Sequence, residues 1–160
     1  MIRTLATTAA IALALAGSGA QAQVERTSAS PTAVIASSAM VPPGTKLYFL
    51  SGSTASPVDP AKPEEFGDTK AQTLSILTKM KAQLEKLGLG MGDIVKMTVF
   101  LVGVPEREGR MDAPAMNEVF KTFFGTPEQP NKPTRSTVQV AALGRPTTLV
   151  EIEAIAAKAP

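Results

Sequence analysis

The chain contains no cysteine, no histidine and no tryptophan, and only one tyrosine among its 160 residues. The lack of cysteine excludes disulfides and thiol nucleophiles. Without histidine as well, the usual zinc ligand sets and any catalytic triad with an imidazole base are excluded. Any reaction must therefore use arginine, lysine, carboxylates, tyrosine, hydroxyls or backbone groups, alone or with a borrowed cofactor. Because aromatic residues make up only 4% of the chain, aliphatic residues and methionine have to build the core.

The chain also lacks any long run of charge of one sign. Its formal net charge is +2, and the basic residues are scattered among acidic ones without aromatic residues between them. This pattern disfavours a nucleic-acid partner. With 44% hydrophobic residues, the chain is long enough for one domain with a substantial core.

The N-terminus has the three-part pattern of a secretory signal peptide. Arg3 is followed by the apolar stretch 9–16 and then by the small-residue pattern at 20–22, which predicts a signal peptide over 1–22 with cleavage before Gln23. The apolar stretch is far shorter than the ~20 residues that span a bilayer, so we expect no membrane attachment after cleavage. The expected location is periplasmic or secreted. A buried helix is the alternative interpretation of this segment.

The remaining chain divides into an irregular N-terminal arm over 23–45 and a domain over 46–160. We expect at most one short edge strand in the arm, around 33–36. Hydrophobic periodicity and turn residues predict strands over 46–51, 93–104, 135–142 and 148–156, and helices from about 69 to 87 and from 113 to 124. This order predicts an α+β fold, a sheet with both helices packed on one face.

Side-chain spacing predicts the buried faces of these elements. In the first helix, Leu74, Leu77, Met80, Leu84 and Leu87 recur at steps of three and four. In the strand over 93–104, the expected core face carries residues two apart: Val95, Met97, Val99 and Leu101. In the second helix, the expected buried stripe is Met116, Val119, Phe120 and Phe123.

The last two strands carry polar side chains that suggest chemistry. If they pair antiparallel about the turn at Gly144, Arg135 and Glu151 fall at the end remote from that turn and share one cleft. A guanidinium can hold a substrate carboxylate with two parallel hydrogen bonds, while a nearby carboxylate activates water. The alternative is a surface salt bridge of ~0 to 1 kcal/mol. The mixed polarity of the second sheet face suggests that another subunit covers it.

At these residues the sequence resembles the RidA (YjgF) family. The resemblance rests on four segments in the family's order, GDIVKMTVFL at 92–101, MNEVFKTFF at 116–124, PTRSTVQVAAL at 133–143 and VEIEAIA at 150–156. It implies a chorismate-mutase-like α+β fold and a homotrimer whose sheets form an inner barrel, with clefts between subunits. It also implies hydrolysis of 2-aminoacrylate and related enamines or imines to 2-keto acids and ammonia, with no metal and no cofactor.

The resemblance assigns roles to individual residues. Arg135 matches the arginine that grips the substrate carboxylate, and Glu151 matches the acid that positions the attacking water. The remaining matches are substrate-binding positions: Ser51, Gly52, Asn117 and Thr137, the last standing where many members carry cysteine.

Three departures from the family pattern concern the cleft. The segment 35–38 lacks the family's tyrosine, and Ser53 replaces a glutamine, so the N-terminal side of the cleft is expected to differ. The stretch 104–112 is longer than usual, and its Arg107 and Arg110 either contact anions or belong to a solvated loop of mixed charge.

Other functions remain open at this point. The chief alternative is a non-catalytic protein that binds small carboxylates or acts as a trimeric interaction module. Chorismate mutase activity would need more cationic groups around a dianion than the sequence offers. Ribonuclease activity, sometimes attributed to relatives, would need a basic groove with aromatic residues, which this sequence lacks.

Overall fold

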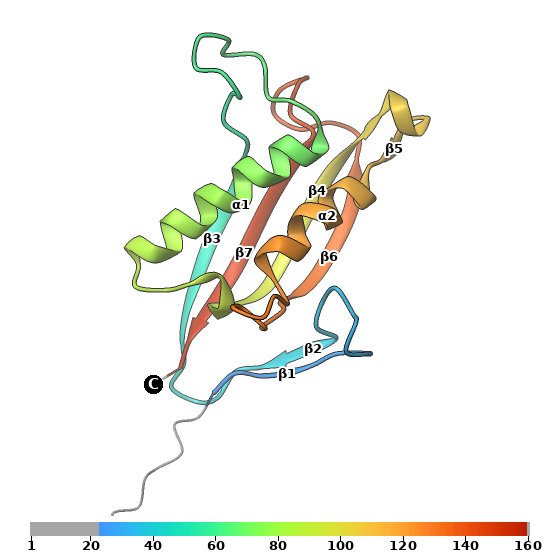
Figure 1. Ribbon diagram of the computed structural model, residues 1–160. Coiled ribbons are helices and arrows are strands. Elements are labelled where there is room, and N and C mark those ends of the chain that lie inside the picture. Colours follow the sequence, from blue (N-terminus) through green and yellow to red (C-terminus); the bar gives the residue numbers. More distant parts are fainter. Residues whose placement is uncertain (1–22, 160) are drawn as a thin grey trace, which may run out of the picture.

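A mixed β-sheet covered on one face by two helices forms the body of the protein (Figure 1). The computed structural model describes residues 23–159, so the predicted signal peptide lies outside the described residues. The elements of this body are β3 (Lys46–Thr54), α1 (Thr69–Lys86), β4 (Ile94–Val104), β5 (Arg110–Met111), α2 (Ala113–Phe123), β6 (Thr134–Val140) and β7 (Val150–Lys158). This arrangement confirms the α+β fold predicted from the sequence.

Strand β4 lies between the last two strands and separates them. Val99 of β4 pairs with Ile152 of β7 on one side, antiparallel, and with Thr137 of β6 on the other side, parallel. Strand β3 pairs with the outer edge of β7, and β5 pairs with the end of β4. The expected hairpin about Gly144 is therefore wrong. Because α2 connects β4 to β6 as a crossover helix, the two strands run parallel and side by side.

Helix α1 begins and ends where its capping residues predict. The Asp68 carboxylate accepts a hydrogen bond from the Ala71 amide at 2.8 Å, and Gly88 follows the helix at φ 69°. Its buried face consists of Thr69, Gln72, Thr73, Ile76, Leu77, Met80 and Leu84. Leu74 is 50% exposed, contrary to expectation, because it lies ~100° around the axis from Thr73. Leu87 is exposed too, since it caps the helix beyond the last buried turn.

Helix α2 and the inner face of β4 complete the core as predicted. Asp112 caps α2 by accepting from the Ala115 amide at 3.2 Å. Met116, Val119 and Phe120 of α2 are buried, as are Val95, Met97, Val99 and Leu101 of β4. Phe123 is only partly buried, whereas the following Phe124 is buried. The helices therefore cover the face of the sheet that the strand periodicity predicted.

The N-terminal arm is more regular than the sequence indicates. It forms a two-stranded hairpin of β1 (Glu25–Thr27) and β2 (Ser38–Met40) beside the lower end of the sheet (Figure 1). The expected strand around 33–36 is reduced to a single bridge between Ala36 and Thr134 at the start of β6. The Arg26 guanidinium anchors the arm by donating to the Gly92 carbonyl at 2.9 Å. The arm thus reaches the strand that carries Arg135.

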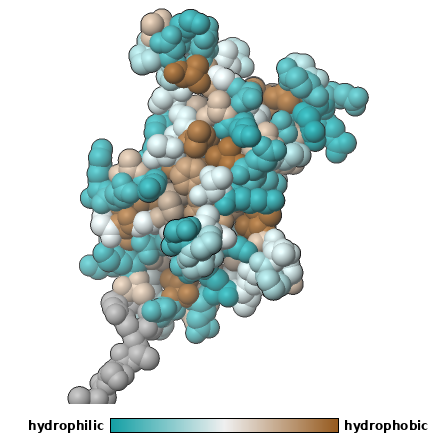
Figure 2. All heavy atoms as spheres, viewed as in Figure 1, coloured by the Kyte–Doolittle hydropathy of each residue, from teal (hydrophilic) through white to brown (hydrophobic). Residues whose placement is uncertain are grey.

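The other face of the sheet carries no helix and exposes apolar side chains. Phe49 is 75% exposed, Leu47 46% and Val138 43%. On the helix-covered face, by contrast, hydrophilic residues dominate the margins and hydrophobic residues gather toward the middle (Figure 2). We call the uncovered side the open face. Among the described residues, no helix has the length and apolarity needed to cross a membrane.

Candidate active site

Arg135 lies on the helix-covered face of β6 and is held by α2. Its guanidinium carbon stands 4.3 Å from the centroid of the Phe120 ring, and its Nη2 donates to the Asn117 Oδ1 at 2.7 Å. Nη1 contacts the Met116 sulfur at 3.5 Å. Because Asn117 and Phe120 lie one turn apart on the same face of α2, the helix fixes the guanidinium in one orientation.

The charge of Arg135 has no partner among the described residues. None of the ion pairs formed among residues 23–159 involves it, and its Nε is buried without a hydrogen-bond acceptor. Burial lowers the pKa of Arg135 to about 10, so the side chain still carries its charge at neutral pH. A half-buried cation without a counterion is costly unless a ligand supplies the anion.

Thr137 offers a second unsatisfied group beside Arg135. Its hydroxyl is also buried without a partner, and it lies two residues along β6 on the same face. Buried polar atoms are almost always hydrogen-bonded in proteins, so each exception needs an explanation. We call Arg135, Asn117 and Thr137 the anion cluster, because together they offer unused hydrogen-bonding groups around one positive charge.

Glu151 lies at a second place, on the open face of β7. It pairs with Phe100 of β4, and its carboxylate lies directly over the backbone of Gly52 in β3. A Cβ at position 52 would overlap the Oε1 of Glu151 and lie 3.0 Å from its Cδ. The strand pairing is irregular between Leu50 and Ser53, so this glycine lies in a bulge. We call Glu151, Gly52 and the adjacent exposed Ser51 the carboxylate cluster.

The two clusters lie on opposite faces of one sheet. Arg135 pairs with Met97 of β4, whose side chain is buried under the helices, whereas Glu151 pairs with Phe100, three residues along on the open face. The expected cleft shared by Arg135 and Glu151 therefore does not form within one chain, and neither does the alternative salt bridge. The clusters also belong to opposite edges, because β3 and β6 are separated by β7 and β4.

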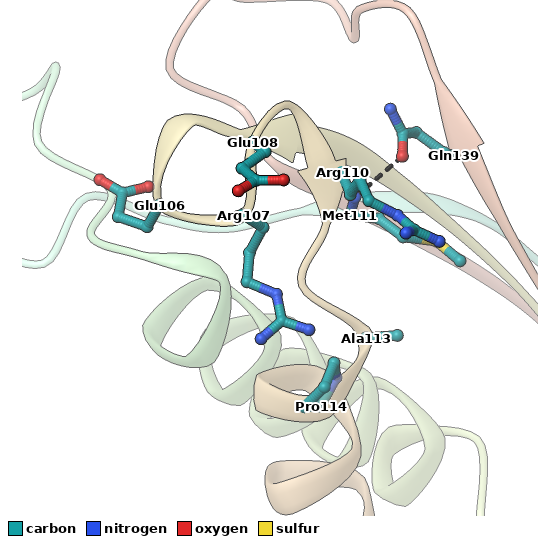
Figure 3. Close-up of a pocket in the computed structure, with 8 residues that line it drawn as sticks. All are labelled: Glu106, Arg107, Glu108, Arg110, Met111, Ala113, Pro114 and Gln139. Carbon is teal, nitrogen blue, oxygen red and sulfur yellow. Dashed lines mark hydrogen bonds between the residues drawn. The ribbon is translucent and has the colours of Figure 1, made fainter.

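A cavity of about 570 Å³ lies near the C-terminal end of β6 (Figure 3). It is formed by the segment between β4 and α2 together with β6, and its lining residues are Glu106, Arg107, Glu108, Arg110, Met111, Ala113, Pro114 and Gln139. Sequence reasoning did not assign Gln139 a role. The alternation along this strand could have identified it, because Gln139 lies on the same face of β6 as Arg135 and Thr137.

A second cavity of about 400 Å³ lies on the open face and includes Ser51, Lys96 and Glu153 among its lining residues. Within residues 23–159, acidic residues form no group of three able to hold a metal ion. The side chains of the two clusters carry guanidinium, carboxylate, amide and hydroxyl groups.

The protein is thus an α+β protein with two helices on one face of its sheet, with Arg135 on one edge strand and the carboxylate of Glu151 beside the other edge strand. A family model described as endoribonuclease L-PSP matches residues 27–158. The chain belongs to this family, which is the RidA (YjgF) family.

Named relatives support the assignment. A protein of Escherichia coli K12, provisionally named as the reactive intermediate deaminase TdcF, is 41% identical over 112 residues, covering 70% of this chain and 79% of its own. A RutC family protein of Pyrococcus horikoshii is 39% identical over 111 residues, covering 69% of this chain and 78% of the relative.

Solved structures share the fold. The crystal structure of E. coli TdcF with bound serine has a TM-score of 0.56 and 38% identity, and the match covers 74% of this chain and 85% of TdcF. The structure of YyfB from Yersinia pestis, a Rid family protein of unknown function, has a TM-score of 0.60 at 25% identity and covers 76% and 85%.

Proposed function

We propose that this protein hydrolyses reactive enamines and imines of the 2-aminoacrylate type to 2-keto acids and ammonia, in a site formed between neighbouring protomers of an exported homotrimer. The observation that carries the proposal is the half-buried guanidinium of Arg135, which forms no ion pair within residues 23–159. A substrate carboxylate would supply that charge. The family membership and the relative named as a deaminase support this chemistry.

Assembly is the step that would bring both clusters together. Arg135 lies on the edge strand β6 and Glu151 lies near the opposite edge, so a protomer placed beside β6 can present its own carboxylate cluster there. The exposed Phe49 and Leu47 on the open face supply apolar surface for such an interface. In a closed ring, each protomer would contact its neighbour through two different edges of the sheet. Such an interface is called heterologous.

The reaction follows from these groups. Arg135 holds the carboxylate through two parallel hydrogen bonds, and an enamine first takes a proton on carbon to become the imine. Glu151 of the neighbouring protomer orients a water molecule, which adds to the imine carbon. The carbon–nitrogen bond then breaks, so that ammonia leaves and the 2-keto acid remains.

The basic test generates 2-iminopropanoate with a separate amino-acid oxidase and follows keto-acid formation. We expect faster formation with the protein than without it. Equal rates at every protein concentration would refute the proposed activity.

A binding-only function has one observation in its favour, the separation of Arg135 and Glu151 on opposite faces of the chain. A thermal-shift measurement with 2-keto acids distinguishes it, because stabilisation by the ligand without turnover of the imine would identify a binder of small carboxylates.

Gly52→Ala should lower the rate of keto-acid formation without unfolding the protein. The new methyl group takes the place of the Glu151 carboxylate, and moving the end of a flexible side chain costs little stability. A misplaced water-positioning group typically lowers the rate on the order of 100-fold. Gly90→Ala is the matched control, since a Cβ there meets no atom within 4 Å. Equal activity of the two variants would remove Glu151 from the mechanism.

Keto-acid binding should weaken as the pH rises through about 10. The pKa of Arg135 is lowered to about 10 by burial, so the free protein is charged below that pH and loses the charge above it. Titration calorimetry with 2-oxobutanoate on both sides of pH 10 measures the change, with circular dichroism to verify folding. Affinity that stays constant across this range would show that Arg135 does not hold the carboxylate.

A further inference from the structure

A cavity of about 320 Å³ lies where the N-terminal arm meets the segment between α2 and β6. Its lining comes from both sides of this junction: Arg26, Ser28, Ser30 and Pro31 from the arm, and Pro130, Asn131 and Lys132 from the segment before β6. Two cations, two hydroxyls and an amide thus line one space, and the lining that the structure describes includes no carboxylate. This composition favours an anion as the ligand.

The polar ends of both cationic side chains lie at this junction. The Arg26 Nη2 and the Asn131 Nδ2 both donate to the Gly92 carbonyl, at 2.9 and 3.3 Å. The guanidinium therefore lies beside an amide that lines the cavity. From the other side, the Lys132 Nζ donates to the Pro31 carbonyl at 3.1 Å, so the ammonium also lies beside a lining residue.

Neither cation is neutralised by an ion pair. None of the ion pairs among residues 23–159 includes Arg26 or Lys132. Burial lowers the pKa of Arg26 below its usual value, and Asp93 opposes this shift from a distance, while its own Oδ2 accepts from the Gly90 amide at 2.7 Å. The junction therefore concentrates positive charge that no carboxylate compensates directly.

Both cations also retain unused hydrogen-bond donors. The Arg26 Nε is buried without an acceptor. An ammonium group has three N–H donors, and Lys132 uses two of them, on the carbonyls of Pro31 and Ala33. The third donor of Lys132 is thus available for a ligand in the cavity that this residue lines.

The two side chains reach across the junction in opposite directions. Arg26 extends from β1 to the segment before β4, and Lys132 extends from the segment before β6 back to the arm. Next to them, the arm meets the sheet at the bridge between Ala36 and Thr134. An anion held between the two cations would add a further link between the arm and the body, and so stabilise the folded protein.

We propose that this cavity binds a phosphate-sized tetrahedral oxyanion, either inorganic phosphate or the phosphate group of a small monoester. Lys132 donates its third N–H to the anion, Ser28 and Ser30 offer hydroxyls, and Arg26 supplies a second positive charge. Neither Arg135 nor Glu151 lines the cavity, so the site is separate from the two clusters and does not depend on the proposed reaction.

The test measures thermal unfolding and titration calorimetry with inorganic phosphate, at an ionic strength held constant with sodium chloride. We expect phosphate at ten times its dissociation constant to raise Tm by about 3 to 5 °C. Lys132→Gln should weaken phosphate binding about 10-fold or more, since it removes one charged hydrogen bond. Lys62→Gln is the control, because the segment between β3 and α1, which contains Lys62, lies at the opposite end of the sheet from the arm (Figure 1).

A pair of variants at the exposed Ser28 tests the site without removing any contact of the two cations. Ser28→Asp places a carboxylate at the cavity, so this variant should bind no measurable phosphate. Ser28→Asn has nearly the same size without the charge, and it should bind phosphate nearly as well as wild type. If circular dichroism shows that Lys132→Gln is unfolded, this pair decides the outcome alone.

A titration with glycerol 1-phosphate distinguishes the two sources of the anion. Tighter binding of this monoester than of inorganic phosphate would identify a phosphorylated small molecule as the ligand, and equal affinity would identify the free anion. A rise in Tm no larger than that given by sodium chloride alone would overturn the site. Phosphate binding that persists unchanged in Ser28→Asp would overturn it as well.

Discussion

Arg135→Met is expected to abolish keto-acid formation while leaving the folded protein as stable as wild type, or more stable. Among the described residues the guanidinium has only Asn117, the Met116 sulfur and the Phe120 ring as partners, and burial already lowers its pKa. Replacing a half-buried, uncompensated charge by an apolar side chain of similar length removes a desolvation cost. The same change removes the group that binds the substrate carboxylate, which typically costs about 2 to 5 kcal/mol of binding free energy.

Activity and stability together make this prediction specific. Steady-state assays with 2-iminopropanoate should show kcat/KM reduced by about 30-fold or more, and thermal unfolding should show an unchanged or raised Tm. Arg145→Met serves as the matched control, because Arg145 lies on the loop between β6 and β7, over the Phe66 ring, away from both clusters. If Arg135→Met lowers Tm and activity in parallel, the arginine is a structural residue.

A mixture of two inactive variants is expected to recover activity. Arg135 and Glu151 lie on opposite faces of one chain, so each proposed site takes its arginine from one protomer and its carboxylate from the next. In trimers assembled from equal amounts of Arg135→Met and Glu151→Gln chains, about one site in four combines an intact arginine with an intact carboxylate. Each variant alone contains no such site.

The experiment unfolds the two variants, refolds them together and compares keto-acid formation with that of each variant refolded alone. Light scattering should give three times the mass of one chain in every sample. Recovery to about a quarter of wild-type activity would support the composite site. Trimers without any recovery would mean that the two residues do not act in one site between protomers, and a monomeric mass would remove the assembly on which the mechanism depends.

The sequence predicted the elements and most of the core because these depend on local properties. Asp68 and Gly88 mark the ends of α1 through capping geometry and positive φ, which are effects of a few neighbouring residues. Alternation along β4 predicted its buried face since adjacent side chains point to opposite sides of a strand. Leu74 was expected to be buried, but the buried face of α1 runs through Thr73 and Ile76 instead. Steps of three and four residues fit both stripes, because the two stripes lie side by side on the helix surface.

Strand pairing could not be predicted in the same way. Two strands that follow one another across a turn at Gly144 favour a hairpin locally, yet β6 pairs with β4, from which α2 separates it in the sequence. The choice is decided by where α2 packs, which is a long-range effect. The error in pairing carried over to the site, because it placed Arg135 and Glu151 in one cleft instead of on opposite faces.

The sequence by itself determined which groups are available for chemistry, since a chain without cysteine or histidine leaves arginine and carboxylates as its principal functional side chains. Through its resemblance to the RidA family, the sequence also identified four candidate site residues, Arg135, Glu151, Gly52 and Asn117. Only the tertiary structure decided that Arg135 and Thr137 carry unsatisfied buried atoms and that Glu151 requires the bare backbone of Gly52. Burial and close approach arise between segments distant in the chain, so local sequence patterns do not contain them.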